Sequence, residues 1–133
     1  MYKHILIPTD GSQLAAEGIS RAIALAKALS AEVTGITVTA PSQVFADTKR
    51  TTAMAEKYLG QIKDAAAAAG VRCRVIHAEH ERPYQAIIDT AKKNSCDLIV
   101  MASHGRRGVS ALVLGSETVK VLTHSSLPVL VYR

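Results

Sequence analysis

Short apolar runs of strand length alternate with amphipathic helical patterns along the whole chain, and this alternation limits the possible folds more than any other feature. The runs typical of buried strands cover residues 2–8, 33–38, 71–78, 96–102 and 129–132. Between them, residues 12–29, 51–69, 83–94 and 116–123 repeat apolar side chains at helical spacing. This alternation predicts a single α/β domain over residues 1–133, with an open parallel sheet and helices on both faces.

Local signals place the ends of several elements. Ser12 is expected to cap the first helix, Gly70 to end the second, and Pro83 to stand in the first turn of the third. In the fourth helix, Val119 and Leu122 are expected to point inward. The third strand alternates apolar and charged residues, which indicates an edge position with one face partly wet.

Polar turns follow three of the predicted strands. In an open parallel sheet the ligand lies beyond the carboxyl ends of the strands, where the strand order reverses. The turns at that end are Thr9-Asp10-Gly11 after the first strand, Thr39-Ala40 after the second, and residues 103–115 after the fourth. We therefore expect these turns to converge on one crevice.

Composition narrows the ligand class. Hydrophobic residues make up 48% of the 133 residues and charged residues 20%, as is typical of a folded globular domain. The net charge of +5 and the pI near 9.4 suit an anionic ligand. Because the basic residues are scattered and aromatic residues make up only 4%, neither a basic stripe nor a stacking platform for nucleic acid is expected.

The sequence also bears on location. No apolar run approaches the length that spans a membrane, and the first residues enter a strand without the apolar region of a signal peptide. Cys73 and Cys96 lie in apolar, strand-like runs without a Cys-x-x-Cys motif, so we interpret them as small buried thiols. A disulfide between them stays open at this stage. A cytoplasmic location and no membrane contact are expected.

The segment Leu98–Ser116 carries the clearest functional signal. It begins as an apolar strand, continues through a glycine-bearing loop with Arg106 and Arg107, and ends at Gly115-Ser116, where a helix begins. Glycine lets the backbone approach an anion, and the free N–H groups and dipole of a helix N-terminus favour negative charge. This layout is typical of phosphate binding. One of the two arginines, not both, would touch the ligand; the alternative is that both are solvated surface residues.

Three common nucleotide motifs are absent. The chain has no Gly-Lys-Ser/Thr of a Walker A loop, no Gly-x-Gly-x-x-Gly after the first strand, and no Ser-Gly-Gly in the first turn. What remains is the pattern Ala102-x2-Gly105-x9-Gly115-Ser116.

With this pattern the sequence resembles the universal stress protein (UspA) family. The opening Ile5-Leu-Ile-Pro-Thr-Asp-Gly-Ser12, the closing Leu127-Pro-Val-Leu-Val131, and the segments 101–105 and 114–116 are similar to that family in order and spacing. The resemblance implies a five-stranded sheet of order 3-2-1-4-5. It also implies an ATP-binding module, with or without Mg²⁺, that acts in stress signalling by binding and not by turnover.

The resemblance also assigns residues to the ATP site. The loop would hold the triphosphate, Asp10 would lie near the ribose, and the backbone of Val38 would meet the adenine edge. The nucleotide-binding residues that it implies are Pro8, Thr9, Asp10, Val38, Ala102, Ser103, His104, Gly105, Arg107, Gly115, Ser116, Glu117 and Thr118.

Several of these residues have a structural interpretation beside the functional one. Asp10 is equally suited to a turn that bonds its own backbone, and Val38 to the core. Ser116 fits either a helix N-cap or a phosphate contact. Glu117 favours the helix dipole but adds negative charge near the phosphates, so it would point to solvent or help to hold a divalent metal. His104 is expected to pack or to bond backbone.

Ala102 is the one departure from the family motif, which carries glycine there. If this position has ordinary strand dihedrals and the phosphate does not press on its Cα, the extra methyl is harmless. If it needs positive φ, nucleotide binding weakens. The departure keeps open a nucleotide-independent interaction protein of the same family, in which the loop is only a connection.

Two further points concern activity and assembly. No catalytic triad, carboxylate pair or activated cysteine is evident, so a slow ATPase is only a weaker alternative. His77-x2-His80 lacks a third metal ligand at suitable spacing.

The apolar last strand, Val129–Tyr132, would lie at a sheet edge, which is normally covered or paired. The resemblance implies a homodimer through this strand; a buried edge strand in a monomer is the alternative.

Overall fold

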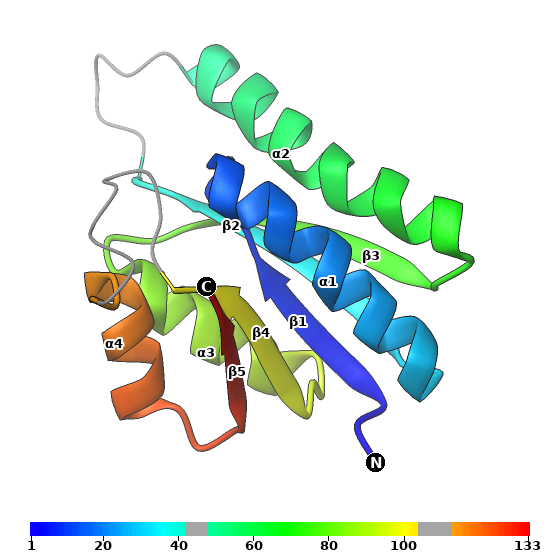
Figure 1. The fold of residues 1–133 in the computed structure, drawn as a ribbon. Coiled ribbons are helices and arrows are strands. Elements are labelled where there is room, and N and C mark those ends of the chain that lie inside the picture. The colour runs from blue at the N-terminus through cyan, green and yellow to red at the C-terminus, as the bar shows by residue number, and fades with distance from the viewer. Residues whose placement is uncertain (42–47, 104–112) are drawn as a thin grey trace.

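The computed structural model describes residues 1–41, 48–103 and 113–133 as an α/β domain with a helix layer on each face of one sheet (Figure 1). The elements follow the expected alternation. In chain order they are β1 (His4–Pro8), α1 (Gln13–Leu29), β2 (Glu32–Thr39), α2 (Thr48–Ala69), β3 (Cys73–Glu79), α3 (Pro83–Lys93), β4 (Leu98–Ala102), α4 (Ser116–His124) and β5 (Val129–Tyr132).

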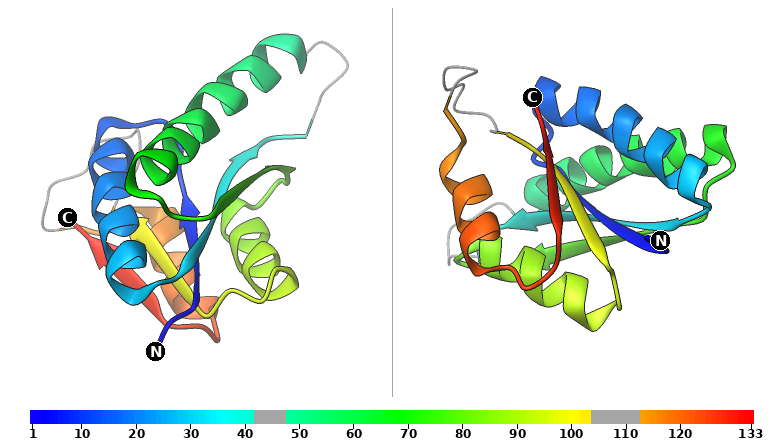
Figure 2. Two further views of the ribbon diagram at one scale, coloured as in Figure 1. Left: turned by 90° about the vertical axis from the view of Figure 1, so that its right-hand side faces the viewer. Right: turned by 60° about the horizontal axis from the view of Figure 1, so that its bottom comes forward.

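The sheet has the order β3-β2-β1-β4-β5, and each neighbouring pair is parallel. This confirms the predicted fold, and it confirms β3 and β5 as the edge strands. The two views of Figure 2 show how the sheet twists between its helix layers, as the right-handed twist of strands requires.

The core has two parts, one on each face of the sheet. Alternate residues of β1 contribute to both parts: Ile5 and Ile7 pack with residues of α1 and α2, and Leu6 packs with residues of α3 and α4. All three side chains are fully buried. Burial on both faces explains why the strands appear in the sequence as continuous apolar runs.

Most of the predicted element ends are confirmed. The Ser12 hydroxyl accepts the Ala15 N–H at 3.2 Å and so caps α1. Gly70 ends α2 with φ +71°, and Pro83 stands in the first turn of α3. Within the described ranges, the helices lack the combination of length and hydropathy that a membrane span requires.

The expected orientation of α4 is wrong. Val119 and Leu122 are 44% and 41% exposed, whereas Thr118 and Val121 are buried. The reason is a tertiary hydrogen bond: the Thr118 hydroxyl donates to the Ala102 carbonyl at 2.9 Å and turns that face of the helix inward.

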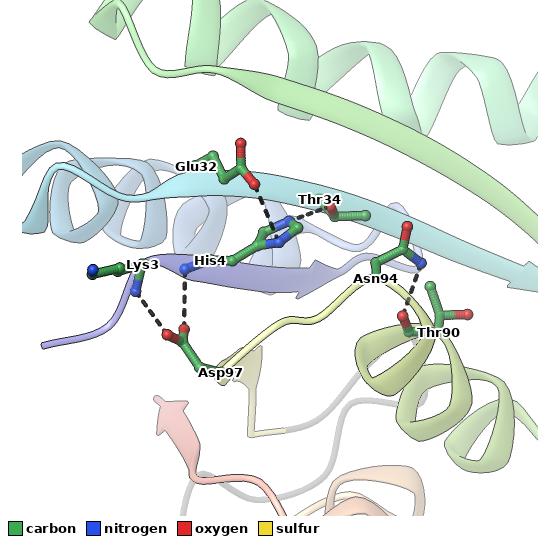
Figure 3. A network of polar contacts seen from close by, with 7 residues as sticks. All are labelled: Lys3, His4, Glu32, Thr34, Thr90, Asn94 and Asp97. Atoms are coloured by element: carbon green, nitrogen blue, oxygen red, sulfur yellow. Dashed lines mark hydrogen bonds and ion pairs between the residues drawn. The ribbon is translucent and has the colours of Figure 1, made fainter.

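A polar network links neighbouring strands at the amino ends of the sheet (Figure 3). The Asp97 carboxylate accepts the backbone N–H groups of Lys3 and His4 at 2.9 and 3.0 Å. The buried His4 ring lies 2.7 Å from the Thr34 hydroxyl and 3.4 Å from a Glu32 carboxylate oxygen. These contacts tie β1 to β2 and to the turn before β4, at the end opposite the predicted site.

Candidate functional site

The neighbouring strands β1 and β4 separate toward their carboxyl ends. Their pairing stops at Leu6 opposite Ile99. Beyond that point β1 runs on beside β2 as far as Pro8, and β4 runs on beside β5 as far as Ala102. The strand order reverses at this place, which is where open α/β sheets bind their ligands (Figure 1).

The turn after β1 is fastened to β2. Thr9 is only 6% exposed, and its N–H donates to the Ile36 carbonyl at 2.9 Å. Its own carbonyl accepts the Thr37 hydroxyl at 2.8 Å. These bonds fix the backbone next to Asp10, whose carboxylate is predicted to bind the ribose.

Asp10 lies exposed at this turn, and its Oδ1 accepts the Ser12 N–H at 2.9 Å. The turn role predicted for Asp10 is therefore confirmed, while its ribose contact stays a prediction. Gly11 has φ +78°, and a Cβ there would lie 2.3 Å from Cε1 of Tyr58. The ring of Tyr58 thus packs directly on the glycine backbone next to Asp10.

The backbone peptide groups of Val38 face the side of β2 on which β1 lies, past the carboxyl end of β1. The Ile36 carbonyl faces β1, and the Thr39 carbonyl faces β3, where it accepts the His80 N–H at 3.0 Å. Because the peptide groups of a strand alternate in direction, those of Val38 face the β1 side, past the last β1 pair at Pro8. The Val38 side chain packs on the α3 and α4 core. A core role and a backbone contact to a ligand are therefore compatible.

The end of β4 is bound to the start of α4. Ser103 is fully buried; its N–H donates to the Tyr132 carbonyl at 2.9 Å, and its carbonyl accepts the Gly115 N–H at 2.7 Å. The Thr118 bond to Ala102 adds a second link. The residues before and after the predicted phosphate loop are thus held together by direct hydrogen bonds.

Gly115, and not Ser116, is the N-cap of α4. Ser116 is the first helical residue and its side chain is exposed, so the N-cap interpretation of Ser116 is wrong. The N-cap residue is a glycine and offers no side-chain acceptor. The first intrahelical hydrogen bond of α4 runs from the Val119 N–H to the Gly115 carbonyl at 3.0 Å. The N–H groups of Ser116 and Glu117 come before this first bond and have no acceptor within the helix. Such N–H groups at a helix N-terminus bind anions.

Glu117 has a partner that sequence reasoning missed. Its Oε2 accepts the Tyr84 N–H at the start of α3 at 2.9 Å, and its Oε1 lies 3.4 Å from Nζ of Lys120. The contact with Tyr84 spans 33 residues of sequence. The signal in the sequence was weak: Arg82, which precedes the helix-starting Pro83, has no side-chain acceptor to cap α3.

Ala102 is the last residue of β4 and pairs with Tyr132 of β5. Among the described residues other than glycine, positive φ is found at Ser30 and Ser95. Ala102 therefore has ordinary strand dihedrals. Of the two possibilities considered above, the structure supports the one in which this position does not need positive φ. The predicted roles of His104, Gly105 and Arg107 lie outside the described residues, as does Arg106.

Tyr132 brings a buried hydroxyl close to the site. Burial, reinforced by the charge of Asp10, raises the pKa of Tyr132 to about 12. Cys73 and Cys96 are free thiols, which settles the disulfide question, and burial raises the pKa of Cys96 to about 11. The Tyr132 hydroxyl and both thiols are therefore neutral at physiological pH, and Tyr132 adds no negative charge near an anion at the site.

The two histidines once considered as metal ligands have other partners. The His77 Nε2 lies 2.7 Å from the Thr39 hydroxyl, and the His80 Nδ1 accepts the Arg82 N–H at 2.8 Å. Over residues 1–41, 48–103 and 113–133, no three His, Cys, Asp or Glu side chains gather in a way that would hold a metal ion.

Known proteins resemble this chain along its whole length. The family model for universal stress proteins matches residues 1–133. Universal stress protein MJ0531 of Methanocaldococcus jannaschii is 33% identical, with 100% of this chain and 83% of that protein covered. The structure of hypothetical protein MJ0577 superposes with a TM-score of 0.85 at 28% identity, over 98% of this chain and 95% of that one. A universal stress protein in complex with cAMP gives 0.76 at 25%, over 99% and 97%.

Proposed function

The chain belongs to the universal stress protein family, and from this premise we propose that it binds ATP and acts as a stress-response signalling module. The nucleotide would lie where β1 and β4 part. Val38 would offer its backbone to the adenine, Asp10 its carboxylate to the ribose, and the start of α4 its N–H groups to the phosphates.

One observation carries the proposal. The turn at Thr9-Asp10, the peptide groups of Val38, the end of β4 and the N-terminus of α4 all lie at the reversal of strand order. Each presents groups that match a different part of a nucleotide: carboxylate for hydroxyls, peptide edge for base, and helix N–H groups for phosphate. The ordinary dihedrals of Ala102 support this proposal against loss of the site.

The cAMP complex of a similar universal stress protein supports an adenine nucleotide as the ligand class. The choice of ATP rests on the Gly105-x9-Gly115-Ser116 pattern, which resembles the motif of the ATP-binding members of the family. A Mg²⁺ ion would accompany the phosphates and neutralise part of their charge.

We propose binding without turnover. Both carboxylates near the site have structural partners, since Asp10 accepts the Ser12 N–H and Glu117 accepts the Tyr84 N–H. Neither is arranged as a base that positions water. A multiple-turnover assay for phosphate release, with Asp10→Ala as control, tests this point, and release above the control would contradict it.

We also propose a homodimer through β5. This strand is a sheet edge, and its Leu130 is 47% exposed, which leaves backbone groups and apolar surface for a second copy. Light scattering after size exclusion at micromolar concentration tests it, and a clean monomer mass would contradict it. A cytoplasmic location stays an expectation from the sequence.

The nucleotide itself can be identified directly. Protein purified without added nucleotide is denatured, and the released small molecules are separated by chromatography and identified by mass spectrometry. Stoichiometric ATP or ADP would support the proposal. If nothing is released, the stripped protein is incubated with ATP, desalted and analysed again; absence of retained nucleotide then contradicts tight binding.

A further inference from the structure

The Glu117 carboxylate joins the starts of two helices at the candidate site. We propose that Glu117 is a positioning residue: it caps α3 from α4, holds the start of α4 in place, and does not itself touch the nucleotide. This inference rests on the proposed function, because the start of α4 is the part that would bind phosphate.

The N-terminus of α3 needs an acceptor that its own residues do not supply. Arg82 stands at the N-cap without a side-chain hydrogen bond to the helix, and Pro83 has no N–H. The N–H of Gln85 already donates to the Arg82 carbonyl at 3.0 Å. The Tyr84 N–H is therefore the donor that an outside group must satisfy, and Oε2 of Glu117 accepts it at 2.9 Å.

The same contact removes a conflict at the phosphate site. Glu117 is the second residue of α4, where an uncompensated carboxylate would repel bound phosphate. In the structure it is turned toward the positive end of the α3 dipole, and Nζ of Lys120 lies 3.4 Å from its other oxygen. Lys120 also lies 5.8 Å from the centre of the Tyr84 ring, so the lysine, the carboxylate and the α3 start form one cluster.

Two hydrogen bonds then fix the first turn of α4 from different sides. Thr118 bonds it to Ala102 at the end of β4, and Glu117 bonds it to Tyr84 at the start of α3. Losing the second bond removes the link to α3 and leaves the link to β4 in place. Oε2 of Glu117 accepts the Tyr84 N–H and Oε1 lies beside Nζ of Lys120, so a Mg²⁺ ion would compete with these contacts for the carboxylate.

The test compares Glu117→Gln, Glu117→Ala, Lys120→Gln and the double variant Glu117→Gln/Lys120→Gln, each titrated with Mg-ATP by calorimetry. The amide exchange rate of Tyr84 is measured in the same proteins by NMR, without nucleotide. Glu56→Gln, which removes one exposed carboxylate charge on α2, is the matched control. Glutamine keeps the oxygen that accepts the Tyr84 N–H, whereas alanine removes it.

We expect Glu117→Ala to speed Tyr84 exchange and to weaken ATP binding by about three- to tenfold, and Glu117→Gln to stay within about twofold of wild type. Lys120→Gln should weaken binding about threefold, because it leaves Glu117 uncompensated, and this effect should vanish in the double variant. A lysine that touches phosphate directly would keep its effect there and would contradict the proposal.

Other results would also overturn it. Equal losses in Glu117→Gln and Glu117→Ala would mean that the carboxylate charge itself binds metal or nucleotide. Wild-type exchange of Tyr84 in Glu117→Ala would remove the link between the helices. Wild-type protein that binds no ATP would overturn the proposed function, and with it the nucleotide part of this inference; the Tyr84 exchange data would still show separately whether the link exists.

Discussion

The ring of Tyr132, at the end of β5, fills the space beside the Cα of Gly18 in α1. A Cβ built on Gly18 would lie 1.4 Å from Cζ of Tyr132, so only glycine fits there without displacement of the ring. The contact joins the last strand to the first helix next to Asp10, whose charge reaches the Tyr132 hydroxyl. The C-terminal strand and the turn after β1 are thus parts of one packed unit.

Gly18→Ala should therefore destabilise the protein, although alanine favours helix. We expect the free energy of unfolding to fall by about 1–3 kcal/mol, the usual range for overpacking, as measured by urea denaturation. Gly60→Ala is the control, because Gly60 lies in α2 with open space around it, and it should gain up to about 1 kcal/mol. Equal gains in the two variants would contradict the packing argument.

Tyr132→Phe should be tolerated or stabilising near neutral pH. The Tyr132 hydroxyl is buried, and within the described part of the chain it has no hydrogen-bond partner. Removing it should raise the free energy of unfolding by up to about 1 kcal/mol. A loss of stability would mean that the hydroxyl makes a stabilising hydrogen bond, and would contradict this prediction.

The same variant gives a pH signature. The pKa of Tyr132 is raised from 10.0 to about 12 in the folded protein, so the unfolded chain loses this proton first. Stability from this group is complete below its unfolded pKa and is lost as the pH rises from 10.0 toward 12. Urea denaturation across this window should show a steeper decline in wild type than in Tyr132→Phe. Parallel declines would contradict the raised pKa.

Gly11→Ala should damage both stability and the candidate site. The position combines φ +78° with the Tyr58 ring against its Cα, whereas Gly70 has φ +71° and open space. Gly70→Ala should therefore cost about 1–2 kcal/mol of backbone strain, and Gly11→Ala about 1–3 kcal/mol more. Denaturation of both variants measures the difference, and equal losses would show that Tyr58 moves away freely.

Thr118→Val removes the hydroxyl that links α4 to β4 while keeping the side-chain shape. The Ala102 carbonyl would lose its donor, so we expect a loss of about 1–2 kcal/mol. Thr123→Val is the matched control, because the exposed Thr123 hydroxyl donates to the Val119 carbonyl of its own helix and, among the described residues, links α4 to no other element. Differential scanning calorimetry compares them. A similar melting point for the two variants would mean that the α4–β4 link contributes little.

Ala102→Gly restores the family motif and tests whether the methyl group matters. Since Ala102 already has strand dihedrals, the backbone gains nothing from glycine there. We expect the Kd for Mg-ATP to change by less than about threefold. A gain of tenfold or more would mean that the phosphate presses on this Cα.

The fold could be predicted from the sequence because its signals are local. Strands buried on both faces produce continuous apolar runs, and caps such as Ser12 and Gly70 mark helix ends. The order of the strands came only from the family resemblance, since local patterns do not state which strands are neighbours. The site turns could be predicted without that order, because they follow the carboxyl ends of parallel strands.

The errors and omissions have a common cause in long-range contacts. The orientation of α4 was wrong because the Thr118 bond to Ala102 joins residues on either side of the loop. The partner of Glu117 lies 33 residues away in α3, and no periodicity indicates it. Likewise, the residues around Gly18 in the sequence do not indicate that the Tyr132 ring packs against it.

Calorimetric titration of the stripped wild-type protein with Mg-ATP tests the central claim most directly. Gly115→Val is run in parallel, because Gly115 is the buried N-cap of α4 and a bulky side chain there would obstruct the N–H groups of that helix. The account predicts saturable binding at one site with a Kd on the order of micromolar, and its loss in Gly115→Val. No heat up to about millimolar ATP, or equal binding by both proteins, would contradict it.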